Sequence, residues 1–266
     1  MIDLDMFKQR LVKAKHIFYI KEISKSVAFQ FVKKYHYLGD AKFFSLCNFG
    51  LFLKCDDSLI GVATYSAPQV PNSLRGWFCD VSNRDLTILE LSRLCVLPEL
   101  NGTNATSFLL GNSIHLLKHR GVRAVITLAD SSRHCGSIYQ VCNFKYYGLT
   151  PERNIFYSES GKKNPRIINK KYTPGCWVKM PRKHRYAYVL DESLKVLHKE
   201  EERPDKMTTE NSVCVGCNGT KTVYDSRFDV YYSCPMCTGK LLRKTLSDNV
   251  NDDTTENCVD VVDLWE

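Results

Sequence analysis

Four cysteines near the C-terminus have the spacing of a metal site. They form two Cys-x-x-Cys pairs separated by sixteen residues: Cys214 with Cys217, and Cys234 with Cys237. Two tight turns of this kind present four thiolates tetrahedrally, which is how proteins hold structural zinc. Because four cysteines leave no coordination position open, we expect this zinc to be structural and not catalytic.

A glycine follows each pair, at Gly219 and Gly239, so the repeated unit is Cys-x-x-Cys-x-Gly. This unit resembles the knuckles of the cysteine-rich region of DnaJ chaperones over about 25 residues. Lys221 and Leu241 replace the second glycine of that pattern, and one site is present where that family has two. We therefore expect the zinc to hold together a module, residues 212–245, that is too small to fold unaided. Docking of this module to DNA or to a partner is the second interpretation.

A polar turn at residues 101–106, Asn-Gly-Thr-Asn-Ala-Thr, follows a predicted strand and opens a predicted helix. Backbone amides and the positive end of a helix dipole make such a turn a phosphate site. In the GNAT family of acetyltransferases the equivalent loop cradles the pyrophosphate of acyl-CoA, and Gly102 stands where that family keeps a glycine. Glu99 and Asn104 depart from the family pattern. The same residues also suit an ordinary connection capped by Asn and Thr, and both readings stay open.

Three short elements carry side chains suited to acid-base or metal chemistry. They are Tyr-His-Tyr-Leu-Gly at 35–39, Leu-Ser-Arg-Leu at 91–94, and Ala129-Asp130 followed by Ile138-Tyr139. With these elements, residues 20–190 resemble the Mom family of bacteriophage DNA-modification proteins. That family is a divergent GNAT branch which converts adenine to a carbamoylmethyl-adenine and so shields phage DNA from restriction. The other reading of the polar residues is structural, with the histidine as a helix cap and the aspartate as a turn former.

The resemblance implies a role for each of these residues. The catalytic or metal-binding positions of the family correspond to His36, Asp130 and Tyr139. The positions expected to contact the cofactor, acetyl-CoA or another acyl-CoA, correspond to Arg93, Asn101, Gly102, Asn104 and Ser107. A histidine, a carboxylate and a phenol bind an oxygen-active metal such as iron, or act as acid and base. An acyl donor alone gives an amide and not a carbamoylmethyl group, so the resemblance also implies a redox or rearrangement step and iron at the catalytic side chains.

A basic segment at residues 152–188 interleaves ten Lys and Arg with aromatic residues and contains only two acids, Glu152 and Glu159. Cations neutralise phosphates, and aromatic faces stack on exposed bases. We expect this segment to contact double-stranded DNA from which the target adenine is flipped out. The residues expected to touch DNA are Tyr37, Lys179, Arg182, Lys183, Arg185 and Tyr186. The alternative is a solvated, positively charged edge of a β-sheet.

Charge divides the chain in the same way. Residues 1–190 carry 28 Lys and Arg against 13 Asp and Glu, whereas residues 191–266 carry 9 against 16. The first part is therefore the candidate for binding a polyanion.

No apolar run approaches the roughly 18 residues of a membrane span, and no signal-peptide pattern opens the chain. We expect no membrane contact and a cytoplasmic location, in the host cell if the protein is viral, where twelve cysteines stay reduced.

The elements that position these residues follow from the hydrophobic pattern. We predict a helix at 24–34, a hairpin from 43–54 and 59–66, strands at 87–97 and 122–129, a helix ending near 120, and a short helix after residue 131. The fold class is α+β, a GNAT-like mixed sheet flanked by helices, followed by a small zinc-bound β-hairpin module. The predicted domains are a catalytic domain at 1–190, an acidic helix and linker at 191–211, the zinc module at 212–245 and an acidic, disordered tail at 246–266.

Three functions fit this sequence. The first is an enzyme that adds a carbamoylmethyl-type group to the exocyclic amine of adenine in phage DNA, in which His36 or Asp130 takes the proton. The second is a GNAT N-acetyltransferase that acts on a protein or a small-molecule amine. The third is a non-enzymatic, zinc-containing DNA-binding protein, for which DNA affinity falls steeply with salt and no base is modified.

Overall fold

The computed structural model describes residues 13–37, 43–68, 73–82, 85–159, 173–204, 222–225, 230–233 and 243–244. The chain divides into two compact units. The first unit comprises residues 1–129, 135–148 and 184–205, and the second comprises 130–134, 149–183 and 206–266. Among the described helices, none is long and apolar enough to cross a membrane.

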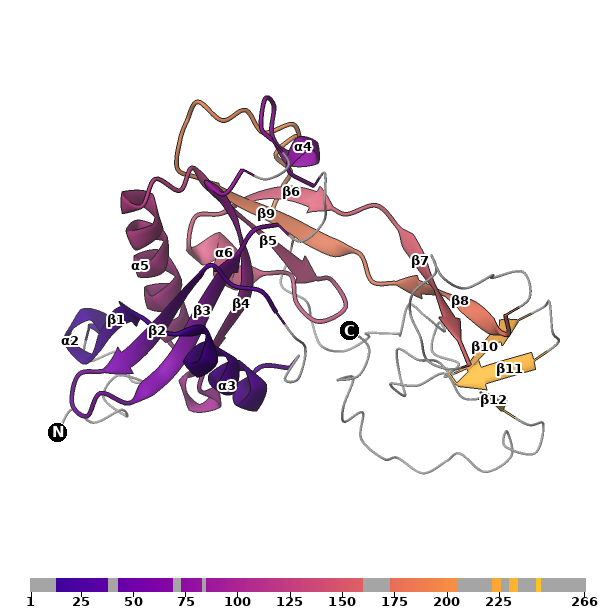
Figure 1. The fold of residues 1–266 in the computed structure, drawn as a ribbon, viewed down its shortest axis with the longest axis horizontal. Coiled ribbons are helices and arrows are strands. Elements are labelled where there is room, and N and C mark those ends of the chain that lie inside the picture. The colour runs from indigo at the N-terminus through magenta and orange to yellow at the C-terminus, as the bar shows by residue number, and fades with distance from the viewer. Residues whose placement is uncertain are drawn as a thin grey trace. The chain divides into compact units, whose positions relative to one another are not determined.

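A seven-stranded mixed sheet forms the body of the first unit (Figure 1). Its spatial order is β1-β2-β3-β4-β5-β9-β6. Neighbours from β1 to β4 are antiparallel, and β4 and β5 are parallel. The strands are β1 Phe18–Glu22, β2 Cys47–Leu53, β3 Leu59–Ser66, β4 Ile88–Val96, β5 Ala124–Asp130, β9 Lys183–Val189 and β6 Lys145–Leu149. The predicted α+β class, a mixed sheet flanked by helices, is confirmed.

Two helices cover opposite faces of this sheet. Helix α3 (Lys25–Tyr35) buries Phe31 and Val32 in a cluster with Val62 of β3. Helix α5 (Ala105–His119) packs against Phe49 and Leu51 of β2, whose side chains point away from the face that carries Val62. The short helices are α2 Ala14–Ile17, α4 Ser73–Trp77 and α6 Ser137–Val141, with a 3-10 turn at Pro98–Leu100. The sheet therefore lies between two apolar layers.

Local sequence accounts for the ends of these helices. Ser24 caps α3, because its hydroxyl accepts a hydrogen bond from the Val27 amide at 3.3 Å. The Val27 side chain itself is exposed. Helix α3 ends at Tyr35, and α5 ends at His119, two residues before Gly121, whose φ of 77° is the left-handed conformation that glycine adopts most easily.

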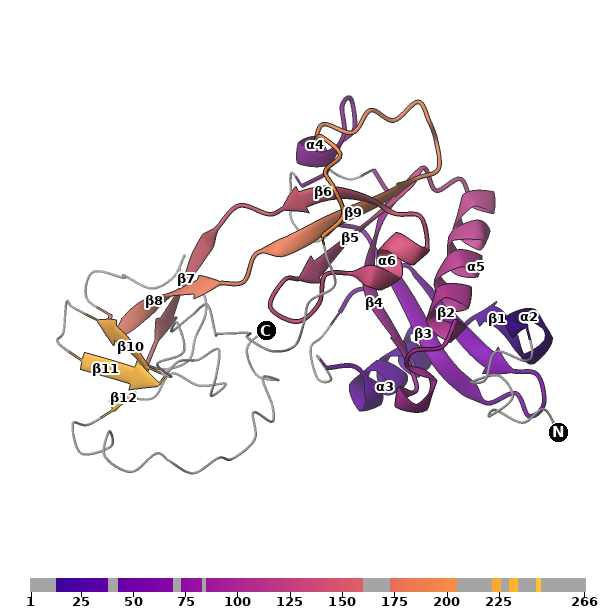
Figure 2. The same ribbon diagram turned by 180° about the vertical axis from the view of Figure 1, so that it is seen from behind.

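The second unit contains two small sheets (Figure 2). Strands β7 (Arg153–Ser158) and β8 (Gly175–Met180) form an antiparallel two-stranded ribbon. Strands β10 (Thr222–Asp225), β11 (Val230–Ser233) and β12 (Arg243–Lys244) form a three-stranded sheet. Tyr157 of β7, Val178 of β8 and Tyr232 of β11 share one apolar cluster, so the ribbon and the C-terminal strands fold together.

Two stretches differ from the sequence-based expectation. The basic segment 152–188 was treated as one surface element, but β9 lies between β5 and β6 inside the large sheet, and Tyr186 is fully buried there. The predicted acidic helix is absent from its described part, residues 191–204. That part instead runs as turns and an extended bridge between Val196 and Phe78, where Leu194 supplies an apolar contact to the core.

Candidate functional site

The parallel strands β4 and β5 diverge after a short common stretch. Their ladder pairs Ile88 with Ala124, Leu89 with Val125, and Glu90 with Ile126, although β4 continues to Val96 and β5 to Asp130. Figure 2 shows the two strands separating beyond this point. Beyond Glu90 and Ile126, β4 and β5 form no further ladder pairs with each other in the described part of the chain.

A β-bulge turns β4 away from β5. Arg93 pairs with Thr64 and Leu91 pairs with Tyr65, so Ser92 has no opposite residue in β3. The Ser92 hydroxyl lies 3.1 Å from the Thr64 carbonyl oxygen and 3.0 Å from the Thr64 hydroxyl. These two contacts fix the bulge within the Leu-Ser-Arg-Leu element that the sequence had singled out.

Arg93, the residue after the bulge, is a partly buried cation. One terminal nitrogen donates to the Ser92 carbonyl oxygen at 2.7 Å, and the guanidinium lies 5.4 Å from the centre of the Phe43 ring. Its Nε is buried without a hydrogen-bond partner, and no carboxylate forms an ion pair with it among the described residues. Burial lowers the pKa of Arg93 from its usual value. A buried guanidinium in this state is suited to an anionic or strongly polar ligand group.

Tyr139 lies on the short helix α6, which follows β5 in the chain. The Thr127 hydroxyl of β5 donates to the Leu91 carbonyl oxygen of β4 at 3.2 Å, which links the two strands where their ladder ends. Burial raises the pKa of Tyr139, and the nearby Thr127 side chain opposes that shift. The phenol is therefore neutral near pH 7 and can donate a proton.

The end of α3 completes this cluster. Tyr37 is 46% exposed and interacts electrostatically with both Arg93 and Tyr139. His36 is the C-cap residue of α3, and its ring stacks on Tyr37 with 4.5 Å between ring centres. One residue from each of the three predicted elements therefore lies in the same region, with Tyr37 close enough to Arg93 and Tyr139 for its charge to influence both.

Asp130 belongs to the second unit, where it closes a turn. Its Oδ1 accepts hydrogen bonds from the Ser132 amide at 3.0 Å and the Ser132 hydroxyl at 2.7 Å. Its carbonyl oxygen accepts from the amide of His134 at 3.0 Å. His134 was not predicted. Burial lowers its pKa, while the charge of Asp130 opposes this shift, so burial favours the neutral imidazole. The Asp-x-x-x-His spacing after a buried strand is the signal that could have identified it.

The predicted cofactor loop has the geometry of a helix start. Gly102 has a φ of 81° and no atom within 4 Å of the position a Cβ would take. Thr103 caps the helix by accepting from the Ala105 amide at 3.2 Å, and the Ser107 hydroxyl donates to the Asn104 carbonyl oxygen at 3.0 Å. Asn101 and Asn104 are exposed, and the first turn of α5 has no acid. The positive end of α5 is thus open to solvent.

The predicted DNA-contacting side chains fall into different environments. Lys179 pairs with Glu152 at 2.9 Å on the surface, and Nε of Arg182 donates to the Thr150 carbonyl oxygen at 2.7 Å. Lys183 and Arg185 are half-buried. The prediction for Tyr186 is wrong, because its ring is buried in the core of the first unit and its hydroxyl bonds to the Cys135 carbonyl oxygen.

Neither metal prediction is tested by the described residues. The zinc ligands Cys214, Cys217, Cys234 and Cys237 lie outside them. No group of three or more His, Cys, Asp and Glu side chains arranged to hold a metal occurs within them. The iron expected from His36, Asp130 and Tyr139 therefore stays a prediction.

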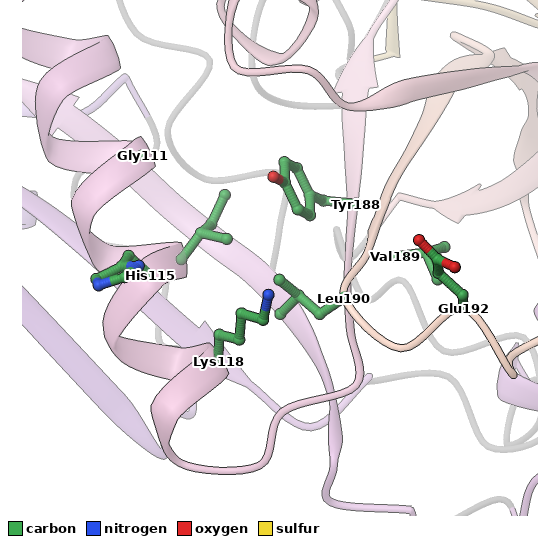
Figure 3. Close-up of a pocket in the computed structure, with 8 residues that line it drawn as sticks. Gly111, His115, Lys118, Tyr188, Val189, Leu190 and Glu192 are labelled. Atoms are coloured by element: carbon green, nitrogen blue, oxygen red, sulfur yellow. The ribbon is translucent and has the colours of Figure 1, made fainter.

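A polar pocket of about 380 Å³ lies elsewhere in the first unit, between α5 and the end of β9. Figure 3 shows His115 and Lys118 on the helix, with Tyr188 and Leu190 opposite. None of the predicted site residues lines it. The site formed by Tyr37, Arg93 and Tyr139 is therefore distinct from this pocket.

The structure defines an α+β protein whose mixed sheet contains two parallel strands, β4 and β5, that pair over a short stretch only. A profile of the Mom protein family matches residues 17–206, which is more than half of the chain. The chain belongs to the Mom protein family.

Several solved structures are similar to this chain, all at low identity. The IAA acetyltransferase from Bacillus cereus is 14% identical, with a TM-score of 0.38 over 65% of this chain and 99% of that one. The ribosomal-protein-S18-alanine N-acetyltransferase from Escherichia coli is 15% identical, with a TM-score of 0.39 over 66% and 95%. A Bacillus subtilis acetyltransferase in complex with CoA is 12% identical, with a TM-score of 0.36 over 65% and 97%. No curated protein matches significantly.

Proposed function

We propose that this protein is a transferase that modifies the exocyclic amine of adenine in DNA, using an acyl-CoA as donor. The observation that carries the proposal is the cluster of Tyr37, Arg93 and Tyr139 beside the diverging ends of β4 and β5, in a member of the Mom family. The basic charge of residues 1–190 supports DNA as the substrate. Transfer of the acyl carbonyl from sulfur to the adenine nitrogen, with CoA leaving as the thiol, gives an amide. The carbamoylmethyl product and the protection from restriction that the family resemblance implies would require an additional redox or rearrangement step.

The residues of the site fit an acyl-CoA. Its pantetheine arm is an extended chain of amides, which the backbone groups of β4 and β5 beyond their ladder would pair with. Its phosphates would be held at the start of α5, where Gly102 lets the backbone approach and no acid stands in the first turn. Arg93 has an unpartnered buried Nε for a polar group of the same ligand. An acyl-CoA supplies an activated carbonyl carbon.

The side chains divide the proton chemistry between them. Tyr139 keeps its proton near neutral pH because burial raises its pKa, so it would protonate the departing group. The adenine amine is a weak nucleophile and must lose a proton as the new bond forms. His36 and Asp130 are the proton acceptors that the family resemblance implies. Tyr37 is half exposed and is the aromatic surface of the cluster on which a flipped base could stack.

Mass spectrometry of nucleosides tests this proposal. Plasmid DNA would be isolated from cells expressing the wild-type chain, Tyr139→Phe, Arg93→Gln or the control Leu197→Ala, which shortens an exposed side chain remote from the cluster in sequence. We expect a heavier deoxyadenosine with the wild type and the control, and a strong loss with the two site variants. The added mass separates an amide from a carbamoylmethyl group. If soluble wild-type protein leaves deoxyadenosine unmodified, the proposal fails, and acetyl transfer to a protein or a small amine becomes the function to assay.

We also propose a structural zinc ion bound by Cys214, Cys217, Cys234 and Cys237. Strands β10 and β11 both lie within the sixteen residues that separate the two cysteine pairs, so the hairpin they form supports a module closed at its base. Such a short module has little core of its own, and a metal stabilises it by linking its two ends.

A further inference from the structure

The ribbon formed by β7 and β8 has two unlike faces. Residues of the two strands alternate between the faces, and directly opposite residues share a face. On one face Ile155, Tyr157 and Val178 pack with Val223 and Tyr232 of the C-terminal strands. The Tyr232 hydroxyl also donates to Glu159 Oε1 at 3.0 Å, just beyond the end of β7. The C-terminal strands therefore brace this face of the ribbon.

The opposite face presents an aromatic ring to solvent. Trp177 is 49% exposed, and it is the one large apolar side chain exposed among the residues of the second unit whose burial the structure describes. Its indole meets the fully buried Phe156, directly opposite on β7, edge to face with 5.5 Å between ring centres. Phe156 and Ser158 are buried on this face, so its exposed part is the end that carries Trp177. The edge-to-face contact with the neighbouring Phe156 ring holds the indole in place, so little conformational entropy is lost if a flat ligand stacks on it.

Polar groups suited to nucleic acid stand beside this ring on the same face. Lys179 lies two residues along β8 from Trp177, with the exposed Asn154 directly opposite it on β7. The pair of Lys179 with Glu152 is half exposed and therefore weak, so the ammonium can exchange this partner for a phosphate. An asparagine amide can donate to and accept from the edge of a base. In the sequence, residues 160–174 between the two strands add five Lys and Arg and no acid.

We propose that this face of the β7–β8 ribbon binds duplex DNA and that Trp177 is the residue that stacks on its bases. A two-stranded antiparallel ribbon fits the major groove, which is about 12 Å wide. An aromatic side chain presented by such a ribbon can stack on a base that has been displaced from the duplex. This inference rests on the proposed function, since it assigns the surface that holds the DNA on which the transferase acts. In this interpretation the C-terminal strands stabilise the ribbon by packing on the face opposite to Trp177.

Binding of a fluorescein-labelled DNA duplex, followed by anisotropy, tests this inference with the full chain. Trp177→Ala should weaken binding about fivefold to 150-fold, the loss expected when one base loses its stacking partner. Trp177→Phe should recover most of that loss because a phenyl ring still stacks. Lys179→Ala should lower the slope of log K against log salt by about one, and the control Leu197→Ala should change nothing. A duplex with 2-aminopurine should show unstacking with the wild type and not with Trp177→Ala.

Several outcomes would overturn the inference. If the wild type binds and modifies DNA while Trp177→Ala binds with equal affinity, the ribbon face is not the DNA surface and the proposed function stands. If single-stranded RNA competes better than the duplex, the occupant is not duplex DNA. If the wild type binds no nucleic acid, the inference and the DNA part of the proposed function fail together. Thermal unfolding of Trp177→Ala close to that of the wild type would show that its loss is not caused by misfolding.

Discussion

Replacing Arg93 with methionine should separate ligand binding from stability. The guanidinium is partly buried, its Nε has no partner, and no carboxylate pairs with it in the described structure. Methionine keeps the length and apolar contact of the side chain without the charge. If Arg93 serves the fold, its replacement should lower the free energy of unfolding of the protein. If Arg93 serves a ligand, its replacement should lower the affinity for that ligand.

The magnitudes follow from the contacts of Arg93. The substitution removes the bond to the Ser92 carbonyl oxygen, worth about 1 kcal/mol, and the contact with the Phe43 ring, worth about 0.5–1 kcal/mol. It also removes the cost of a buried donor without a partner, about 1–3 kcal/mol. These contributions offset, so the free energy of unfolding should change by less than about 1 kcal/mol. A charge-assisted hydrogen bond from Arg93 to the bound acyl-CoA contributes about 1.5–3 kcal/mol. Its loss should therefore raise the Kd for acetyl-CoA roughly tenfold to 150-fold.

Urea unfolding and calorimetric titration with acetyl-CoA measure the two quantities on the same protein. Arg120→Met is the matched control, since Arg120 forms an exposed ion pair with Glu22 at 2.8 Å, outside the cluster, and should leave the Kd unchanged. Loss of more than about 3 kcal/mol of stability, as when one partner of a buried ion pair is removed, would show that Arg93 serves the fold. An unchanged Kd for Arg93→Met would refute the reasoning even if stability behaves as expected.

Three further predictions concern the fold and the zinc module. Gly136→Ala should lower the free energy of unfolding, measured in urea, by about 2–4 kcal/mol. The reason is that φ is 79° at this position and a Cβ would lie 2.6 Å from Cε2 of Tyr186. A variant as stable as the wild type would show that the turn relaxes without cost. Burial raises the pKa of Tyr186 from 10.0 to about 12, so its contribution to stability is complete below pH 10 and is lost as pH rises toward 12. Tyr186→Phe should flatten this alkaline loss in thermal unfolding, and an identical pH profile would contradict the assignment. The chain should contain one zinc ion by elemental analysis and none in Cys214→Ser, whereas an unchanged metal content would exclude the four-cysteine site.

Much of the central sheet could be read from the sequence because its hydrophobic pattern and its turns agree. The hairpin of β2 and β3, the strands β4 and β5 and the helix α5 were each predicted within a few residues of their observed bounds. The strand β9 was missed because Lys183 and Arg185 alternate with buried His184 and Tyr186, and a count of charges hides that alternation. Composition also made residues 191–204 look helical, although contacts of Leu194 and Val196 with the core hold them extended.

The candidate site could be predicted only in part. Residue types and the family resemblance identified Arg93 and Tyr139, and the structure joins them to Tyr37. The bulge at Ser92 left no signal in the sequence, because register is a property of two paired strands and not of one. His134 escaped notice because its importance depends on burial, which a single polar turn does not reveal. The oxygen-rich turn at Asp130 shows the structural role that a sequence alone could not separate from a catalytic one.

The order of the strands has a consequence for how the protein is made. β9 fills the place between β5 and β6, but the ribosome releases it only after the entire β7–β8 excursion has emerged. Until then β5 and β6 lack the strand that pairs with both. The apolar face of the ribbon stays uncovered for longer, because β10 and β11 are translated after β9. Both units would therefore close late in synthesis, and a nascent chain truncated before residue 183 should be bound by chaperones and degraded, not accumulate as a half-formed sheet.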